Sequence, residues 1–315
     1  MDVIALTFFV NLVLPLLLVL WMAGPWVTSR LEGLTLALIA ASYAGFVFLS
    51  GPIWAWVGMG LRWAPVVLVG AGLVVMLLRW PGRPWLPRRR WREWVSVTTK
   101  GFVAAIFGFL FATSLAGLRP PGATVSIGLP LEPGEYVVLN GGSTATLNHH
   151  NAVKAQRYAI DVVALKDGAR RATGLMPPEM GDYAIYGRAI LAPCDGTVLA
   201  TSDGAPDTPI GGSNAEAPAG NYVTLLCEID GARLTILVAH MLPGSVAVAP
   251  GQRMNTGERL GLVGSSGNSS EPHLHIHAVA GEVRDLNAVI GTAEPVPLAI
   301  GGHFLARNDT FGRVR

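Results

Sequence analysis

The chain has 315 residues, of which 51% are hydrophobic and 14% charged, and its formal net charge is +2. This length fits one to three domains. Neither half has the basic stripe typical of nucleic-acid binding, so we expect no nucleic-acid partner. Residues 1–118 carry nine Lys/Arg and three Asp/Glu (net +6), whereas residues 119–315 carry fourteen and eighteen (net −4). The charge division predicts two parts of different character.

The first part contains long apolar runs that predict a membrane region of about four helices over residues 1–118. No Lys or Arg precedes the first run, so we interpret it as an uncleaved anchor in contact with membrane lipid. Ionisable residues are absent from the middles of the runs, which favours anchoring over transport. The runs cover about residues 3–24, 35–58, 64–79 and 101–118.

The loop between the third and fourth runs predicts the orientation. The other loops hold one basic residue each, so the positive-inside rule places the basic loop in the cytoplasm and, with four crossings, both termini outside. The third run is short and contains Gly70 and Gly72. If it does not span the membrane, this argument weakens. The basic residues of the loop are Arg79, Arg83, Arg88, Arg89, Arg90, Arg92 and Lys100.

The second part begins with a Pro/Gly-rich linker, residues 119–135, and continues with short apolar segments separated by Gly, Asp and Asn. Such segments predict an all-β domain with a mostly antiparallel sheet over residues 136–300, followed by a tail, residues 301–315. CDGT and IDGA read as hairpin turns. Cys194 and Cys227 could form a disulfide outside the cytoplasm or remain two buried thiols, and the sequence leaves both open.

Three of the seven histidines alternate with apolar residues in HLHIH: His273, His275 and His277. On a strand they share one face, where polar ring nitrogens need partners, and a metal ion would satisfy that need. Neutral imidazole is a preferred zinc ligand. Asp161 interrupts an apolar strand, and His240 ends another. We therefore expect these segments to meet at a metal site.

An ordered set of motifs supports this interpretation. APCDGTV, GNYVTLL, LVAHM and VAPGQRMNTGERLGLVGSSGNSSEPHLHIH occur in this order within about residues 145–290. The set resembles the lysostaphin/LytM-type zinc metallopeptidases. The resemblance implies a LytM-like β domain that binds Zn²⁺ and hydrolyses peptide bonds of peptidoglycan in the bacterial cell wall. With the predicted orientation, it implies a multi-pass protein of the bacterial cytoplasmic (inner) membrane whose C-terminal domain is extracytoplasmic.

The resemblance also implies roles for single residues. Asp161 and His275 would be zinc ligands, and His240 and His273 would be the catalytic histidines. They would orient or deprotonate the zinc-bound water and stabilise the oxyanion. His277 stands where the family often has another polar residue, so it would lie behind the ligands or serve as an alternative ligand.

One position departs from the family pattern. Arg157 stands four residues before Asp161, where the family has its first His ligand, and Arg cannot bind zinc. His149 and His150 in LNHHN precede it, and we favour His150 as the replacement, because NHHNAVKAQRYAIDV resembles a variant branch of the family. In the alternative, both are ordinary loop residues and the domain is a degenerate module that binds and regulates other cell-wall hydrolases. The substrate could also be a protein rather than peptidoglycan.

Overall fold

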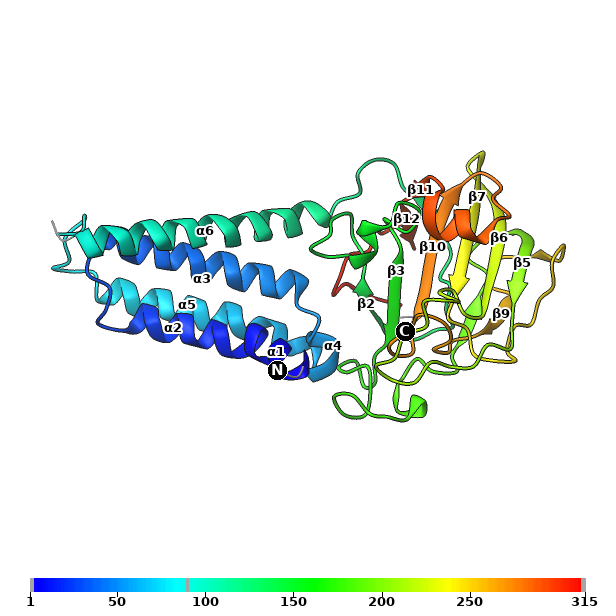
Figure 1. Cartoon of the computed structure of the whole chain (residues 1–315), viewed down its shortest axis with the longest axis horizontal. Coiled ribbons are helices and arrows are strands. Elements are labelled where there is room, and N and C mark those ends of the chain that lie inside the picture. The colour runs from blue at the N-terminus through cyan, green and yellow to red at the C-terminus, as the bar shows by residue number, and fades with distance from the viewer. Residues whose placement is uncertain (1–2, 89–90, 313–315) are drawn as a thin grey trace. The chain divides into compact units, whose positions relative to one another are not determined.

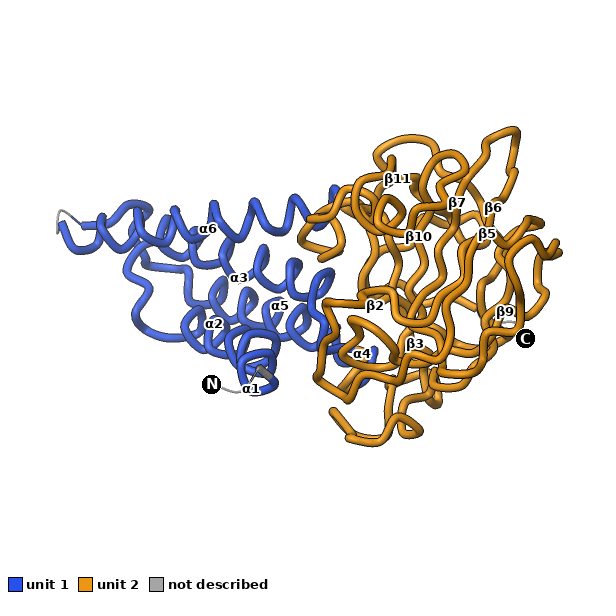
Figure 2. The backbone as a smooth tube through the Cα atoms, turned by 45° about the vertical axis from the view of Figure 1, so that its right-hand side comes forward, with its two compact units in different colours: residues 1–54, 58–116 blue, residues 55–57, 117–315 orange. Residues whose placement is uncertain are grey.

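The computed structural model describes residues 3–88 and 91–312. The chain divides into two compact units, shown in blue and orange in Figure 2: residues 1–54 and 58–116 form unit 1, and residues 55–57 and 117–315 form unit 2. Two arginines of the predicted cytoplasmic loop, Arg89 and Arg90, lie outside the described residues, as do residues 313–315 of the predicted tail.

Unit 1 is helical, and the prediction of about four apolar helices is confirmed. Four segments are long and apolar enough to cross a membrane: Ile4–Ala23, Arg30–Ser50, Met59–Leu78 and Trp91–Gly117. The helices, labelled in Figure 1, are α1 (Val3–Phe8), the π-helix η1 (Phe9–Val13), α2 (Leu14–Ala23), α3 (Arg30–Ser50), α4 (Trp54–Val57), the 3-10 helix η2 (Met59–Arg62), α5 (Trp63–Leu78) and α6 (Trp91–Gly117).

The helices extend beyond the apolar runs because polar residues cap and continue them. Ser29 accepts a hydrogen bond from the Glu32 backbone N–H, so α3 begins at Arg30, before its apolar run. The first ten residues of α6 are largely polar, and Lys100 near their end pairs with Glu32 (Nζ–Oε1 2.5 Å). This buried ion pair joins α6 to α3.

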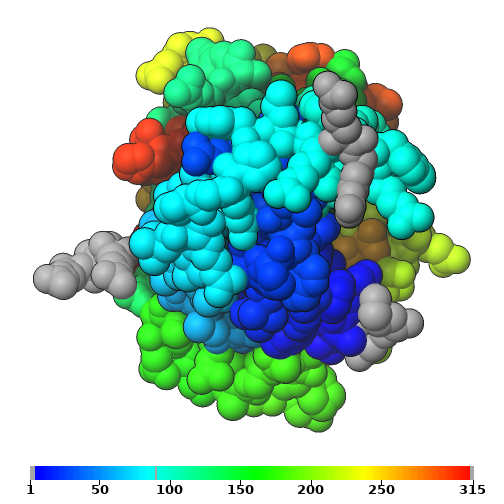
Figure 3. Space-filling model, turned by 90° about the vertical axis from the view of Figure 1, so that its left-hand side faces the viewer, coloured from blue at the N-terminus to red at the C-terminus, as the bar shows by residue number. Residues whose placement is uncertain are grey.

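The segment before α6 is hydrogen-bonded to the start of α3. The backbone N–H groups of Arg30 and Leu31 donate to the carbonyls of Pro84 and Trp85 at 2.9 and 3.0 Å. Figure 3 shows cyan side chains of this part of the chain beside blue ones of the first helices. The Arg30 guanidinium also lies 4.8 Å from the Trp85 ring centroid, a cation–π contact. These contacts order part of the predicted cytoplasmic loop.

Unit 2 confirms the predicted β class. Its main sheet has nine strands in the order β13-β2-β3-β10-β7-β6-β5-β8, with β11 also paired to β10, and all its pairs are antiparallel. The strands are β1 (Val125–Ile127), β2 (Tyr136–Asn140), β3 (Ile160–Ala164), β4 (Ala189–Leu191), β5 (Gly196–Ser202), β6 (Tyr222–Ile229), β7 (Ala232–Ala239), β8 (Arg253–Met254), β9 (Arg259–Leu262), β10 (Leu274–Ala280), β11 (Pro295–Val296), β12 (Leu298–Ile300) and β13 (Thr310–Phe311).

The centre of this sheet brings distant parts of the sequence together. β10 lies between β3 and β7 (Figure 1), and His275 pairs with Asp161 on one side and with Ala239 on the other. His240 follows Ala239 directly. Strands that are more than a hundred residues apart in the chain therefore carry the polar residues into one place.

The two predicted hairpin turns have different outcomes. IDGA is a hairpin turn between β6 and β7: Asp230 and Gly231 have φ of 51° and 77°, the left-handed values that a two-residue turn of this kind requires. The prediction for CDGT is wrong, because β4 pairs with β9 whereas β5 pairs with β6 and β8. The turn therefore joins strands of two different sheets.

Short strands also occur in the segments expected to be linker and tail. β1 pairs in parallel with β12, and β13 extends the main sheet at β2. Cys194, in the turn before β5, forms a disulfide with Cys227 of β6, with 6.1 Å between the Cα atoms. Of the two alternatives that the sequence left open, the structure has the disulfide.

Candidate functional site

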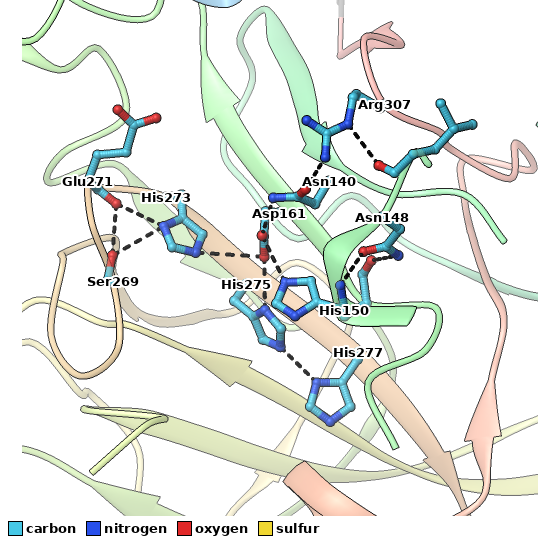
Figure 4. Close-up of polar contacts among 12 residues, drawn as sticks. Asn140, Asn148, His150, Asp161, Ser269, Glu271, His273, His275, His277 and Arg307 are labelled. Atoms are coloured by element: carbon cyan, nitrogen blue, oxygen red, sulfur yellow. Dashed lines mark hydrogen bonds and ion pairs between the residues drawn. The ribbon is translucent and has the colours of Figure 1, made fainter. Parts of the chain in front are cut away.

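Asp161 is the centre of the polar cluster on the sheet. It lies on β3 with only 3% of its surface exposed. One carboxylate oxygen, Oδ2, lies 2.8 Å from His150 Nε2 and accepts a hydrogen bond from Asn140 Nδ2 at 2.9 Å. The other, Oδ1, lies 2.9 Å from His275 Nδ1 and 3.7 Å from His273 Nε2 (Figure 4). Three histidines therefore converge on one buried carboxylate.

His150 reaches Asp161 from a short 3-10 turn, His149–Ala152. Asn148 caps this turn, because its side-chain oxygen accepts from the His150 backbone N–H at 3.1 Å. The Asn148 amide nitrogen donates to the carbonyl of Ala159 at 2.9 Å, which ties the turn to the start of β3. The local sequence thus directs one of the two adjacent histidines at the carboxylate.

The neighbouring residues are placed differently. His149 is exposed, and its ring centroid lies 3.9 Å from that of His150. The possible ligand atoms of His149, His150 and Asp161 all lie within 4.8 Å of one another. Arg157, at the departure from the family pattern, has an exposed side chain. A histidine that precedes Arg157 is therefore close enough to Asp161 to bind the same metal ion, which Arg157 cannot do.

His275 and His277 lie on the same face of β10 and are buried. His275 Nε2 is 2.9 Å from His277 Nδ1, and His277 Nε2 is 3.0 Å from the Val289 carbonyl oxygen. The Nδ1 atom of His275 is the one that faces Asp161. His277 therefore lies behind His275 on the side away from the carboxylate.

His240 and His273 form the opposite wall, with ring centroids 4.8 Å apart. His240 directly follows β7 and has φ of 61°, a left-handed conformation unusual for a residue other than glycine. Its Nδ1 lies 2.8 Å from the Ser266 carbonyl oxygen, and His273 Nδ1 lies 2.8 Å from the Glu271 carbonyl oxygen. Since a carbonyl only accepts, both Nδ1 atoms donate, and Nε2 is the ring nitrogen that can accept when the ring is neutral.

The loop that carries Glu271 is held by a buried ion pair. The side chain of Arg171 is fully buried, and its Nη2 lies 2.6 Å from Glu271 Oε2. Its Nε donates to the same carboxylate at 2.9 and 3.0 Å. Arg171 thus fixes the residue whose backbone carbonyl orients His273.

The protonation states follow from burial. Burial lowers the pKa of His275 to about 3 and that of His277 to about 4, and holds the pKa of His240 well below its ordinary value. Burial alone would raise the pKa of Asp161, but the charges of His150 and His273 and the hydrogen bonds to the carboxylate hold it well below its ordinary value. A neutral His275 beside an ionised Asp161 is the protonation state that metal ligands require.

A pocket of about 230 Å³ lies beside the cluster. Pro218 and Ala219 belong to the segment 202–220. Thr208 anchors this segment by two hydrogen bonds, because its hydroxyl donates to the Gly267 carbonyl and its N–H donates to the Ser265 carbonyl. The lining of the pocket combines polar and apolar side chains. Its lining residues are His149, His150, His240, His275, Gln156 and Asn268, with Val153, Pro218, Ala219, Leu237, Ala239 and Ile290.

Comparison with known proteins identifies the domain. Residues 182–286 match the sequence model of peptidase family M23. This segment, within the C-terminal domain, belongs to the family. The matched segment of the M23 domain contains His240, His273, His275 and His277, whereas His149, His150 and Asp161 precede it.

Solved structures resemble parts of the chain at low identity. A zinc-containing peptidase from Vibrio cholerae is 21% identical over 31% of this chain and 25% of its own, with a TM-score of 0.24. Lysostaphin from Staphylococcus simulans is 20% identical, and the alignment covers 31% of this chain and 38% of lysostaphin, with a TM-score of 0.23. A peptidase M23 from Pseudomonas aeruginosa is 19% identical, and the alignment covers 57% of this chain and 58% of that protein, with a TM-score of 0.29. The first two alignments span well under half of those proteins, and no curated protein matches.

The donor atoms of the cluster fit zinc, the metal of the lysostaphin/LytM-type enzymes that the motifs resemble. His150 Nε2, His275 Nδ1 and the Asp161 carboxylate combine two imidazole nitrogens with one oxygen ligand. The arrangement brings together all seven residues that the sequence singled out, with His149 at its exposed rim.

Sequence reasoning missed the residues that support the site. Asn140 ends an apolar strand in YVVLNGG, which is a weak signal of the kind that drew attention to His240. Arg307, which donates to Asn140 Oδ1, and the Arg171–Glu271 pair carry no local signal, because their partners are far away in the chain.

Proposed function

We propose that this chain is a membrane-anchored zinc endopeptidase that hydrolyses peptide bonds of cell-wall peptidoglycan. The observation that carries the proposal is the approach of His150 Nε2 and His275 Nδ1 to the two oxygens of one buried carboxylate, Asp161. Membership of the M23 family supports the peptidase activity. The resemblance of the motifs to lysostaphin/LytM-type enzymes supports peptidoglycan as substrate, ahead of a protein.

The residues divide into two groups by role. His150, Asp161 and His275 would hold zinc, and bound zinc would supply a Lewis acid and a water of lowered pKa. His240 and His273 would accept and return a proton at Nε2, because the carbonyls of Ser266 and Glu271 keep their Nδ1 atoms protonated. The 230 Å³ pocket that His240 helps to line would receive one part of the peptide against its apolar lining residues.

The location of the domain is part of the proposal. The basic segment between the third and fourth helices supports a cytoplasmic loop and an extracytoplasmic C-terminal domain. The disulfide between Cys194 and Cys227 supports the same side, because disulfides persist outside the reducing cytosol. The four helices would anchor the enzyme in the bacterial cytoplasmic membrane, next to its substrate.

The test measures zinc and hydrolysis on the full chain in detergent. We expect about one zinc per chain by elemental analysis, as the three-residue ligand set requires. His150→Ala should lose the zinc, and the adjacent His149→Ala variant, the matched control, should keep it. The wild type should release soluble peptide fragments from purified peptidoglycan, and His150→Ala should not.

Each departure from this result has a definite meaning. A wild type without zinc after purification in its presence would overturn the metal site. Zinc loss in His149→Ala alone would assign the first ligand to His149. Zinc without fragment release from peptidoglycan would overturn the proposed activity and favour the alternative, a module that binds and regulates another wall hydrolase.

A further inference from the structure

His277 has a chain of contacts that determines where its hydrogen lies. It is 1% exposed, and its Nε2 lies 3.0 Å from the Val289 carbonyl oxygen. A carbonyl oxygen can only accept a hydrogen bond, so His277 Nε2 must donate. A second hydrogen would make His277 a cation buried among apolar residues, which is costly. The neutral ring therefore has a lone pair on Nδ1.

The same reasoning extends to His275. Its Nε2 lies 2.9 Å from His277 Nδ1, which is an acceptor, so His275 Nε2 carries the hydrogen. The Nδ1 atom of His275 then has a lone pair directed at Asp161 Oδ1, 2.9 Å away. Two acceptors at this distance repel each other unless a cation lies close to both. The tautomer therefore prepares Nδ1 to bind a metal.

We infer that His277 is a positioning residue that accepts the Nε2 hydrogen of His275 and, through its own bond to the Val289 carbonyl, fixes the tautomer in which His275 Nδ1 can bind the metal. The inference rests on the proposed zinc site. It also removes His277 from the possible ligands, because both of its ring nitrogens already have partners.

The Val289 carbonyl, which accepts the hydrogen bond from His277, belongs to a π-helix, Ala288–Thr292. Its next two carbonyls hold the other side of the site: Ile290 O accepts from Gln156 Nε2 at 2.6 Å, and Gly291 O accepts from the Ala155 N–H at 3.2 Å. Gln156 lines the same pocket as His150. A turn just beyond the segment matched to the family thus supports both sides of the proposed metal site.

The test compares two substitutions of His277 in the full chain in detergent. His277→Leu keeps an apolar side chain of similar bulk and removes the acceptor, and should weaken zinc binding about 10–100-fold in competition with a chromophoric chelator. His277→Gln offers one acceptor and one donor on a planar amide, so it should remain closer to the wild type than to His277→Leu. The thermal midpoint of each metal-free variant checks that it folds.

A second measurement reads the tautomer directly and needs neither variant to fold. In the zinc-loaded wild type labelled with ¹⁵N-histidine, the ring nitrogen shifts of His275 should report hydrogen on Nε2 and none on Nδ1. Hydrogen on Nδ1 would overturn the inference, as would equal zinc affinity in His277→Leu and the wild type, or equal loss in both variants. A wild type that binds no zinc would instead overturn the proposed function.

Discussion

Asn140 donates a hydrogen bond from Nδ2 to Asp161 Oδ2 at 2.9 Å, across the pair of strands β2 and β3. The register of this pair shifts between Val138 and Asn140, an irregularity that brings Asn140 opposite Asp161. Arg307 donates to the Asn140 Oδ1 atom, so the amide has its nitrogen toward the carboxylate. Arg307, in the segment between β12 and β13, thus helps to orient the central carboxylate of the proposed site.

We expect Asn140→Ala to weaken zinc binding about 10-fold or more, because residues that orient a metal ligand commonly contribute that much. Chelator competition measures the loss. Asn255→Ala, in an exposed turn, serves as the control and should leave the affinity unchanged. Equal affinity in Asn140→Ala and the wild type would show that Asp161 is oriented without this bond.

Removal of one partner of the buried Arg171–Glu271 pair should destabilise the fold. We expect Arg171→Met to cost about 3–5 kcal/mol, because Glu271 would keep an uncompensated charge, and to lower peptide hydrolysis as His273 loses its fixed partner. The control is Arg233→Met, which breaks an exposed pair with Glu282 and should destabilise the fold far less, because solvent screens the pair. Thermal unfolding of the full chain gives both values, and similar losses in the two variants would contradict the prediction.

The disulfide should contribute measurably to stability. Cys194 and Cys227 are 33 residues apart, and closing a loop of this length stabilises a fold by about 3–4 kcal/mol on a chain-entropy basis. The double variant Cys194→Ser, Cys227→Ser should therefore unfold at a lower temperature, and a reductant should lower the midpoint of the wild type but not that of the variant. An unchanged midpoint in the variant would contradict the prediction.

The metal-free domain should become less stable in mild acid. Burial lowers the pKa of His275 to about 3 and that of His277 to about 4, from 6.5. Below pH 6.5 the unfolded chain therefore binds protons that the folded chain excludes. The free energy of unfolding should fall between about pH 6.5 and pH 4, by up to about 1.4 kcal/mol per pH unit for each ring. Asp161 contributes only below about pH 3.8, because its pKa is depressed.

Denaturation of the zinc-free chain at several pH values measures this slope. His277→Leu removes one of the rings with a lowered pKa, so the slope of its free energy of unfolding against pH should be smaller by the contribution of about one proton. A slope that is the same in the variant and the wild type would exclude His277 as a source of the acid sensitivity.

Local patterns predicted much of this protein. Apolar runs predicted the helices, and alternation of His with apolar residues predicted that His273, His275 and His277 share a face. Ends of elements were less predictable, because α6 continues through the polar residues from Trp91 to Lys100, where the pair with Glu32 supports it. IDGA was predictable as a hairpin turn since its geometry is local, but CDGT was not, because only the pairing of β4 with β9 separates it from β5.

By itself the sequence determined the class of each unit, the family motifs and the residues with suitable chemistry, because these depend on periodicity and side-chain type. It could not decide which of His149 and His150 would lie at Asp161, since the two are adjacent and chemically the same. The tertiary structure directs His150 at Asp161 through the Asn148 cap. Only the tertiary structure also showed that Asn140, Arg307 and Val289 support the site. Their hydrogen bonds join segments far apart in the chain and form only after the sheet has assembled.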